Sequence, residues 1–408
     1  MKHYEISSDD MIILRDGRPF GESGVFGGTS LDWPFPQTIA GMCRSAVGLQ
    51  RDPNFFKDSR NAKKIMKIGI QRLMPLLSAD GDECLLPTPA DLVFSGVECR
   101  NVHVQTYKPL GKGEGTDIAC PHWLYPEVEL KEKPTVRPKF LRHNFAERYL
   151  SGALGVCEEF SDEDANVVFG TVQETRIHTA INPKTSSADE GKLFAESGMY
   201  LVASKSDGTS GMQERITSPE SVSRHTGVLG DIKICFSLSA LEENERLPDS
   251  VYLGGERRRA AVRECETGLY PVLPALNGEE KFLKLLLTTH GDFGSWAPDW
   301  LVPGEDVSTC DWVDEPRSGV RIRLRSAVIS GWDPVSGWDY AKWKPKAFRK
   351  LVCPGSVYLI ELEQPDRAGE LVNKLHGESL CGAGSQSELD GFGQVVVAKA
   401  MHISEGEE

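Results

Sequence analysis

The chain has 408 residues and a formal net charge of −14, with 39% hydrophobic and 26% charged residues. This length predicts two to three domains, and this composition is typical of a globular protein. The acidic balance argues against sequence-independent duplex binding, which needs a basic surface, and the lack of a long apolar run argues against membrane insertion.

The first part of the chain is predicted to alternate short strands with two helices. We expect strands at 11–14, within 84–95, at 230–240 and at 250–255, and a helix from about 61 to 74. Another helix is marked by apolar residues at helical spacing: Ile39, Met42, Cys43, Ala46 and Val47. Arg44 lies outside that apolar stripe.

A long hairpin is predicted in the middle of the chain. Residues 171–181 and 192–202 form its two arms, joined by the polar segment 182–191. These arms are longer than packing alone would need.

The region 269–280 contains two prolines and a glycine with little periodicity, so we place a domain boundary there. Beyond it we expect strands at 282–289, 319–329, 355–362 and 394–401, and a helix at 366–376. Short strands with few helices predict an α+β class, with helices on one face of an antiparallel sheet.

The segment GGERRRAAVR, residues 254–263, is unexpected in so acidic a chain. Gly254 and Gly255 permit a close approach of the main chain to a ligand or to another strand. Arg257, Arg258, Arg259 and Arg263 supply planar cationic donors suited to phosphate. Most arginine-rich turns simply face water, which is the alternative explanation of this segment.

Three other segments combine features of an RNA-binding surface with simpler explanations. In GVRIRLR, Arg321, Arg323 and Arg325 alternate with apolar residues and face one side of a strand, toward either solvent or an anion. Residues 331–350 interleave aromatic rings with lysines and arginines, as stacking sites for unpaired bases do. A late loop carries Gly382, Gly384, Gly391 and Gly393, which fits a phosphate cradle or a β-turn.

Signatures of common enzymes are absent from the sequence. There is no GxSxG, Walker A, HExxH or paired CxxC motif, and Cys120 with His122 does not make a zinc site. His178, His225 and His290 are candidates for the general base of a metal-free ribonuclease, but no sequence motif pairs any of them with an acid. Ten separated cysteines favour the reducing cytoplasm.

Several stretches, in this order, resemble the third RAMP subunit of the Cmr-type (type III-B) CRISPR effector complex. They are RDGRPFG, WPFPQTIAGMCRSAVG, PTPADLVF, LFAESGMYL, LGGERRRA, SGWD, KPKAFRKLVCPGSVYLIEL and DGFGQVVVA. The resemblance implies two tandem ferredoxin-like (RRM-like) RAMP domains. The first, residues 1–270, would carry a protruding thumb at about 171–202, and the second, residues 271–408, a glycine-rich loop.

The resemblance also implies a function without catalysis, cofactor or metal. The protein would bind the 5′ tag of the CRISPR RNA, similar to Cas-five-type proteins, and would contact target RNA at the tag-proximal edge. Its protein partners would be the large signalling subunit and a backbone RAMP subunit. A RAMP-type endoribonuclease that processes CRISPR transcripts, and a purely structural subunit, remain as alternatives.

The implied RNA-binding residues are spread along the whole chain. They are Arg15, Arg18, Arg44, Arg176, His178, Gly254, Gly255, Arg257, Arg258, Arg259, Lys344, Lys346, Gly391, Phe392 and Gly393. The terminal loop also carries Glu388 and Asp390, which would weaken phosphate binding there.

Overall fold

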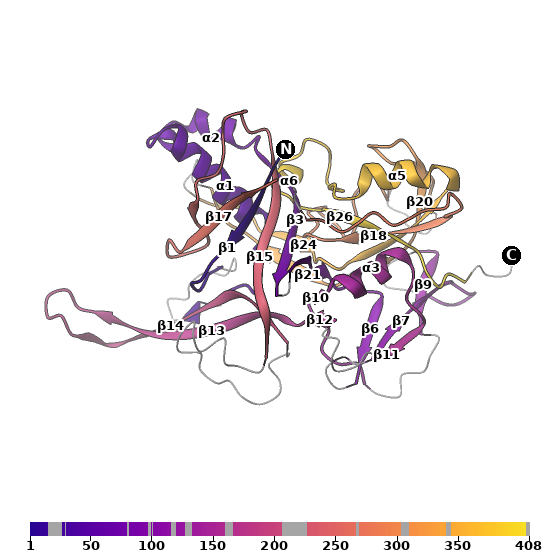
Figure 1. The fold of residues 1–408 in the computed structure, drawn as a ribbon, viewed down its shortest axis with the longest axis horizontal. Helices are drawn as coiled ribbons and strands as arrows, with labels where there is room; N and C mark the ends of the chain where they lie inside the picture. Colours follow the sequence, from indigo (N-terminus) through magenta and orange to yellow (C-terminus); the bar gives the residue numbers. More distant parts are fainter. Residues whose placement is uncertain are drawn as a thin grey trace.

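The computed structural model shows a mixed α/β protein built mainly from strands (Figure 1). The structure describes residues 1–14, 27–28, 30–79, 81–96, 99, 101–115, 120–126, 133–159, 166–205, 227–266, 269–302, 310–339 and 344–404. Within these ranges, no helix combines the length and the apolar character that a bilayer span requires. The predicted α+β class is therefore confirmed in its coarse form, strands with few helices.

The described residues contain helices of 4 to 16 residues. They are α1 (Pro36–Arg51), α2 (Ser59–Ile65), α3 (His143–Ser151), α5 (Ala368–Leu375) and α6 (Gln386–Leu389), with 3₁₀ turns η1 (Phe55–Lys57) and η3 (Pro365–Arg367).

The strands up to the hairpin are β1 (Lys2–Ser7), β2 (Gly27–Gly28), β3 (Gly69–Ser78), β4 (Asp82–Cys84), β5 (Leu86–Pro87), β6 (Leu92–Ser95), β7 (Asn101–Val104), β8 (Thr106–Pro109), β9 (His122–Tyr125), β10 (Phe140–Leu141), β11 (Cys157–Glu159) and β12 (Val167–Val168). The later strands are β13 (Gly170–Ile181), β14 (Ala188–Ser204), β15 (Val228–Ser239), β16 (Ser250–Tyr252), β17 (Arg259–Cys265), β18 (Phe282–Leu287), β19 (Val313–Asp314), β20 (Arg321–Val328), β21 (Trp332–Val335), β22 (Trp338–Asp339), β23 (Lys344–Pro345), β24 (Arg349–Val352), β25 (Val357–Leu362) and β26 (Val395–Lys399).

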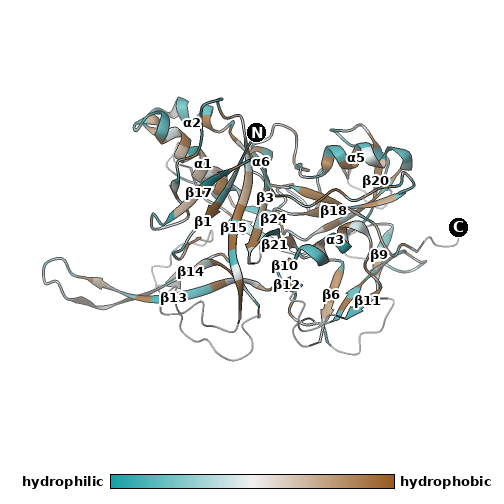
Figure 2. Ribbon diagram, viewed as in Figure 1, coloured by the Kyte–Doolittle hydropathy of each residue, from teal (hydrophilic) through white to brown (hydrophobic). Residues whose placement is uncertain are grey.

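The first sheet is centred on β15. Its neighbouring antiparallel strands follow the order β3-β15-β1-β17, so β1 lies between two strands that come much later in the sequence. Along β15, Ile232, Ile234, Phe236 and Leu238 occupy alternate positions and are buried in the first core. Figure 2 shows β15 as largely hydrophobic and α2, at the outer edge, as largely hydrophilic.

Helix α1 covers this core. Pro36 stands in its first turn, where the missing N–H costs nothing, and the predicted stripe of Ile39, Cys43 and Val47 is buried against the sheet. The helix prediction from apolar spacing is confirmed.

The second sheet repeats the same order with different strands. Its strands lie in the order β20-β25-β18-β26. When the four strands of each sheet are numbered along the chain, both sheets have the spatial order 2-3-1-4. Helix α5 packs Leu371, Val372 and Leu375 into the core of this second sheet.

The described residues between 85 and 168 form an insertion that covers the second sheet. Phe94, Tyr149 and Leu150 from the insertion share a core with Leu286 and Val396 of the sheet. The same interface contains a fully buried ion pair, in which Lys284 Nζ lies 2.6 Å from Asp91 Oδ2 and neither side chain is exposed.

The two sheets are joined through the side chain of Gln394. Its Oε1 accepts a hydrogen bond from the Leu73 N–H at 2.8 Å, and its Nε2 donates to the Ile70 carbonyl at 3.0 Å. These β3 groups flank Arg72, whose φ of 52° interrupts the regular ladder with β15. A side chain just before β26 therefore satisfies backbone groups that the first sheet leaves unpaired.

We expect Gln394→Ala to lower the free energy of unfolding by about 2–4 kcal/mol, because two buried backbone groups lose their partners. Urea unfolding followed by tryptophan fluorescence measures this loss. Gln50→Ala, at an exposed position of α1, is the control and should change little. Equal behaviour of the two variants would show that Gln394 does not hold the sheets together.

The predicted hairpin is present as β13 and β14 and extends away from the body of the molecule (Figure 1). Its strands pair from Gly170↔Ser204 near the body to Ile181↔Ala188 near the tip, so the arms are longer and the tip shorter than expected. Ile177, Ile181 and Leu193 on these arms are 69%, 59% and 64% exposed, which packing within the chain does not explain.

Two sequence predictions of local structure are wrong. The helix expected at 61–74 ends at Ile65, and residues 69–78 form strand β3. Because β3 contributes Ile70 to one core and Met74 to another, it is apolar on both faces, a pattern that also fits a buried helix. Residues 11–14 are buried as expected but make only an isolated bridge, Ile12 to Met199, instead of a strand.

Candidate functional site

The glycines of the arginine segment serve a tight turn between β16 and β17. Gly254 has a φ of 76°, and a Cβ there would collide with the Ile13 carbonyl oxygen. Gly255 donates its N–H to the same oxygen at 2.7 Å. The close approach that two glycines permit is therefore made to residues 11–14 of this chain.

The turn itself places its charged residues outward. Glu256 and Arg257 have φ values of 54° and 52°, and the Arg258 N–H reaches the Gly255 carbonyl at 3.3 Å, as in a hairpin turn of type I′. Arg257 is exposed, and none of the described residues pairs with it. Arg259 is also exposed, with its guanidinium 5.9 Å from the centre of the Tyr252 ring.

The arginine turn lies against the middle of the hairpin, around the pair Arg176↔Glu196, where β14 pairs with β2; this region is called the hairpin base. Arg258 donates to Asp10 Oδ2 at 2.8 Å and lies 3.9 Å from Glu196 of β14. Glu196 in turn lies 3.6 Å from Nε2 of His178 on β13. Two separate segments with predicted RNA-binding residues are thus brought together around one carboxylate.

Arg176 belongs to the same hairpin base and is held by its neighbours. Its guanidinium donates to Glu174 and to the Tyr200 hydroxyl, and that hydroxyl donates to Glu174 at 2.5 Å. The bonds from Arg176 and Tyr200 hold the pKa of Glu174 below its usual value despite burial, and burial together with Glu174 raises the pKa of Tyr200 to about 12. Arg176, His178 and Arg258 therefore each lie beside a carboxylate. Arg257 and Arg259 are the exposed arginines of this region.

The glycine-rich loop has a different role from the one predicted. Gly391, Phe392 and Gly393 are buried, and the Phe392 ring packs with Phe35 and Leu351. Gly391 and Gly393 have φ values of 88° and 72°, which the turn before β26 requires. In this structure these residues join the two sheets and offer no exposed surface to an RNA strand.

Arg44 is part of the same junction. It is 5% exposed, its Nη1 lies 2.5 Å from Asp390 Oδ1, and the rest of its guanidinium donates to the carbonyls of Ile68 and Leu389. It lies outside the apolar stripe of α1, as expected, yet it is buried because α6 covers that side of the helix. The guanidinium is therefore already used within the chain.

Lys344 and Lys346 are exposed on the short β22–β23 hairpin. Part of the aromatic and basic segment predicted at 331–350 lies outside the described residues, as do Arg15, Arg18 and His225. Of the remainder, Lys350 lies 4.3 Å from the centre of the Trp332 ring, and Arg349 is bonded to Asp292 and Gln37. These contacts are internal.

The arginine ladder on β20 forms ion pairs with glutamates of its own sheet. Arg323 and Arg325 lie 2.7 and 3.4 Å from Glu361 on the neighbouring strand β25, and Arg321 lies 3.4 Å from Glu363. The sequence leaves solvent exposure and anion binding as explanations of this ladder. These ion pairs weaken the case for anion binding.

A cavity of about 430 Å³ lies at the junction of the sheets and the insertion. Its walls come from residues 31–36 at the start of α1, residues 137–140 of the insertion, and residues 288–290 after β18. The Lys139 ammonium lies 2.6 Å from Asp32 at this wall, and burial lowers its pKa while Asp32 opposes the shift. Thr171, at the start of β13, donates to the Asp32 carbonyl, so the cavity adjoins the end of the hairpin that lies within the body.

Two polar atoms beside the cavity lack partners among the described residues. They are Arg137 Nε and Thr88 Oγ1, both fully buried. Arg137 also donates to the Thr88 carbonyl and, at 3.0 Å, to Ser330. Sequence reasoning missed Arg137 and Lys139, although the basic pair in RPKF, residues 137–140, was a signal.

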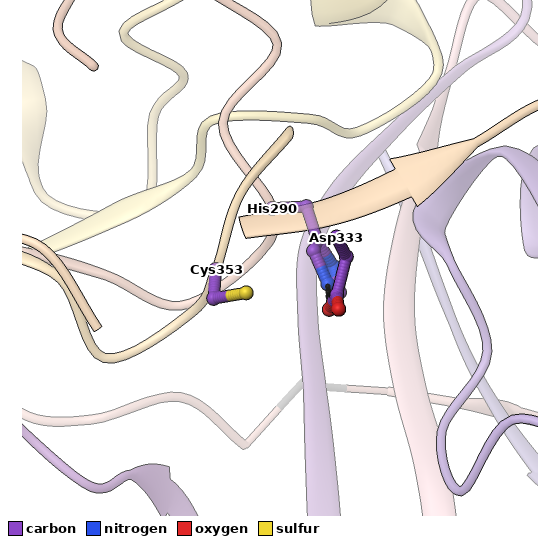
Figure 3. Close-up of side chains that lie close together, drawn as sticks. All are labelled: His290, Asp333 and Cys353. Carbon is purple, nitrogen blue, oxygen red and sulfur yellow. Dashed lines mark hydrogen bonds and ion pairs between the residues drawn. The ribbon is translucent and has the colours of Figure 1, made fainter. Parts of the chain in front are cut away.

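A histidine, an aspartate and a cysteine of the cavity lining lie close together (Figure 3). His290 Nε2 lies 2.9 Å from Asp333 Oδ2, and burial lowers the pKa of His290 while Asp333 opposes the shift. Burial and Asp333 raise the pKa of the Cys353 thiol to about 12. The sequence indicates His290 as a candidate base but not its partners Asp333 and Cys353, because each comes from a distant part of the chain.

A family model described as CRISPR-associated protein (Cas_Cmr3) matches residues 4–400. The chain belongs to this Cmr3 family. The resemblance found in the sequence is confirmed by this match, which spans both sheets, the insertion and the hairpin. No curated protein matches the chain.

Solved structures similar to this Cmr3-family chain have low sequence identity to it. A chain in "Cryo-EM structure of the Type III-B Cmr-beta bound to cognate target RNA and AMPPnP, state 1" is 13% identical, with a TM-score of 0.44 and coverage of 98% of this chain and 99% of that chain. A chain in "Crystal structure of Csm3-Csm4 subcomplex in the type III-A CRISPR-Cas interference complex" is 9% identical, with a TM-score of 0.29 and coverage of 88% and 92%.

Among the predicted RNA-binding residues of this Cmr3-family chain, the structure gathers one group. Arg176, His178 and residues 254–259 meet at the hairpin base, while Arg44 and residues 391–393 lie buried at the junction of the sheets. Lys344 and Lys346 lie on a separate exposed hairpin. The accessible candidates therefore form two groups, Arg257 and Arg259 at the arginine turn and Lys344 and Lys346 on that separate hairpin.

Proposed function

We propose that this Cmr3-family protein is a non-catalytic subunit of a type III-B CRISPR complex that targets RNA, and that it binds the 5′ tag of the CRISPR RNA. The tag would lie along the arginine turn and the base of the β13–β14 hairpin. The observation that carries the proposal is the contact of these two segments around Glu196, which lies 3.6 Å from His178 and 3.9 Å from Arg258. The exposed guanidinium groups of Arg257 and Arg259 supply the charge for phosphate contacts.

The strand order supports two tandem ferredoxin-like RAMP domains, divided at about residue 270. In each sheet the four strands lie in the order second, third, first, fourth, and all are antiparallel. A βαββαβ unit of the ferredoxin-like type has this arrangement. The first unit keeps the helix after its first strand, α1, and the second keeps the helix after its third strand, α5.

The hairpin is proposed as the thumb that contacts target RNA at the tag-proximal edge of the guide–target duplex. Ile177, Ile181 and Leu193 are exposed on its arms, and apolar side chains presented in this way can insert between base steps and unstack them. The protein partners proposed for the body are the large signalling subunit and a backbone RAMP subunit.

We expect the double variant Arg257→Ala/Arg259→Ala to bind tag RNA at least about tenfold more weakly, because each substitution takes a charged hydrogen bond away from a phosphate. The slope of log affinity against log salt should flatten by about 0.7 for each phosphate that the variant no longer neutralises. Both side chains are exposed, so the fold is expected to survive. Filter binding of labelled tag RNA to the assembled complex over a salt series measures both quantities.

Lys63→Ala/Lys64→Ala is the matched control, because it removes two charges from exposed positions of α2. Its affinity and salt slope should equal those of the unchanged protein. If the arginine and lysine variants behave alike, the turn is not the tag site, and its arginines would be assigned to protein contacts in a structural subunit.

A second candidate function is a RAMP-type endoribonuclease that processes CRISPR transcripts. The observation that favours it is the His290–Asp333 pair beside a cavity that Arg137 and Lys139 also line, since a histidine base and nearby cations suit metal-free RNA cleavage. Incubating the purified chain with labelled repeat RNA in a chelator decides between the two functions. Cleavage that His290→Ala abolishes would establish the enzyme.

A further inference from the structure

The wall of the junction cavity holds three different potential metal donors within a short distance of one another. A ring nitrogen of His290, a carboxylate oxygen of Asp333 and the sulfur of Cys353 all lie within 4.8 Å of each other. Figure 3 shows the Cys353 sulfur directed toward the paired His290 and Asp333 side chains. His290 is only 7% exposed, whereas the Asp333 side chain is 48% exposed, so the group lies where the buried wall meets solvent.

Backbone pairing fixes this arrangement. Gly291 and Val352 exchange two hydrogen bonds of 2.9 Å, so the next residues along, His290 and Cys353, stand opposite each other. On the other side of β24, Asp333 of β21 pairs with Leu351, and the Cys353 N–H bonds the Gly331 carbonyl at 3.0 Å. Leu351 and Cys353 are two residues apart, so Asp333 and Cys353 lie on the same face.

The donor types and spacing suit a tetrahedral zinc ion. Zinc binds thiolate at about 2.3 Å and imidazole or carboxylate at about 2.0–2.2 Å, which puts its donor atoms roughly 3.3–3.6 Å apart. Donors already within 4.8 Å reach that geometry through small side-chain movements. A thiolate ligand disfavours magnesium and calcium, which prefer oxygen donors.

We propose that His290, Asp333 and Cys353 bind one zinc ion, with water in a fourth position that faces the cavity. Binding replaces the thiol proton of Cys353, which passes to the solvent, and the resulting thiolate and carboxylate balance the charge of the ion. The neighbouring ammonium of Lys139 is already neutralised by Asp32 at 2.6 Å, so it adds little repulsion. This site goes beyond the proposed RNA-binding function and does not depend on it.

The test uses the purified full-length chain, stripped with a chelator and then titrated with Zn²⁺ against a chromophoric competitor. We expect about one tightly bound zinc per chain, and a loss of affinity well above tenfold in Cys353→Ser and in His290→Gln, which each remove one donor. With Co²⁺ in place of zinc, the unchanged chain should show a sulfur-to-cobalt charge-transfer band that Cys353→Ser lacks.

Cys157→Ser is the matched control, because it removes an exposed thiol in a different sheet. It should keep both the zinc affinity and the cobalt band. Thermal melting of the metal-free variants checks folding, and zinc should raise the melting temperature of the unchanged chain but not of Cys353→Ser. The proposal is overturned if the chain binds no zinc tighter than the competitor, or if Cys353→Ser binds it with unchanged affinity.

Discussion

Replacing Asp91 with alanine is expected to lower the free energy of unfolding by about 3–5 kcal/mol, one of the two largest effects we predict. Asp91 is the counter-charge of Lys284, and both side chains are fully buried between the insertion and the second sheet. The Asp91 carboxylate also accepts hydrogen bonds from the hydroxyls of Tyr107 and Tyr149. Burial and the Asp91 charge raise the pKa of both phenols, so both remain donors at neutral pH.

Asp91→Ala should lower the free energy of unfolding because Lys284 would be left charged, buried and without a partner. Adding Lys284→Met to Asp91→Ala should therefore recover most of the lost stability, since it removes the stranded charge. Asp82→Ala is the control: it breaks another lysine–aspartate pair, with Lys233 at 2.8 Å, at a partly exposed position, and should cost under about 1 kcal/mol. Urea unfolding measures all three, and a similar loss in Asp82→Ala and Asp91→Ala would contradict the argument.

Gly254→Ala is the second large prediction, with an expected loss of about 2–5 kcal/mol. The φ of 76° is strained for any residue with a Cβ, and that Cβ would overlap the Ile13 carbonyl oxygen. Ile13 and Gly255 must then separate, which breaks their 2.7 Å hydrogen bond and moves the turn that carries Arg257. Stability and tag affinity should therefore fall together.

Gly278→Ala separates the two causes. Gly278 has a similar φ of 83°, but a Cβ there meets nothing within 4 Å, so only backbone strain of about 1–2 kcal/mol is expected. Thermal melting followed by circular dichroism compares the variants. If Gly278→Ala is as destabilising as Gly254→Ala, the contact with Ile13 contributes nothing.

The sequence is informative where one face of an element is buried. Helix α1 and strand β20 have the periodicity that a half-buried environment imposes, and the sequence predicts both. The hairpin is predictable because turn residues separate two alternating runs. Strand β3 resembles a helix in sequence, because a strand between two cores loses its alternation.

Pairings across long distances in sequence could not be predicted. Nothing local to Arg44 indicates that Asp390 will meet it, and nothing near His290 points to Asp333 or Cys353. The glycines at 254 and 255 correctly indicated a close approach of the main chain, but a single sequence cannot tell whether the approaching group is a ligand or a backbone carbonyl. The net charge of each candidate site therefore cannot be predicted locally, because carboxylates from distant segments pair with its cations.

The shared core of the insertion and the second sheet has a consequence for synthesis of the protein. Phe94, Tyr149 and Leu150 leave the ribosome well before Leu286 and Val396, which cover them in the finished fold. During translation this apolar surface stays uncovered until the final strand emerges, and such intermediates are prone to aggregate. An added chaperone that covers this surface should therefore raise the yield of soluble protein, whereas removal of the final strand should lower it.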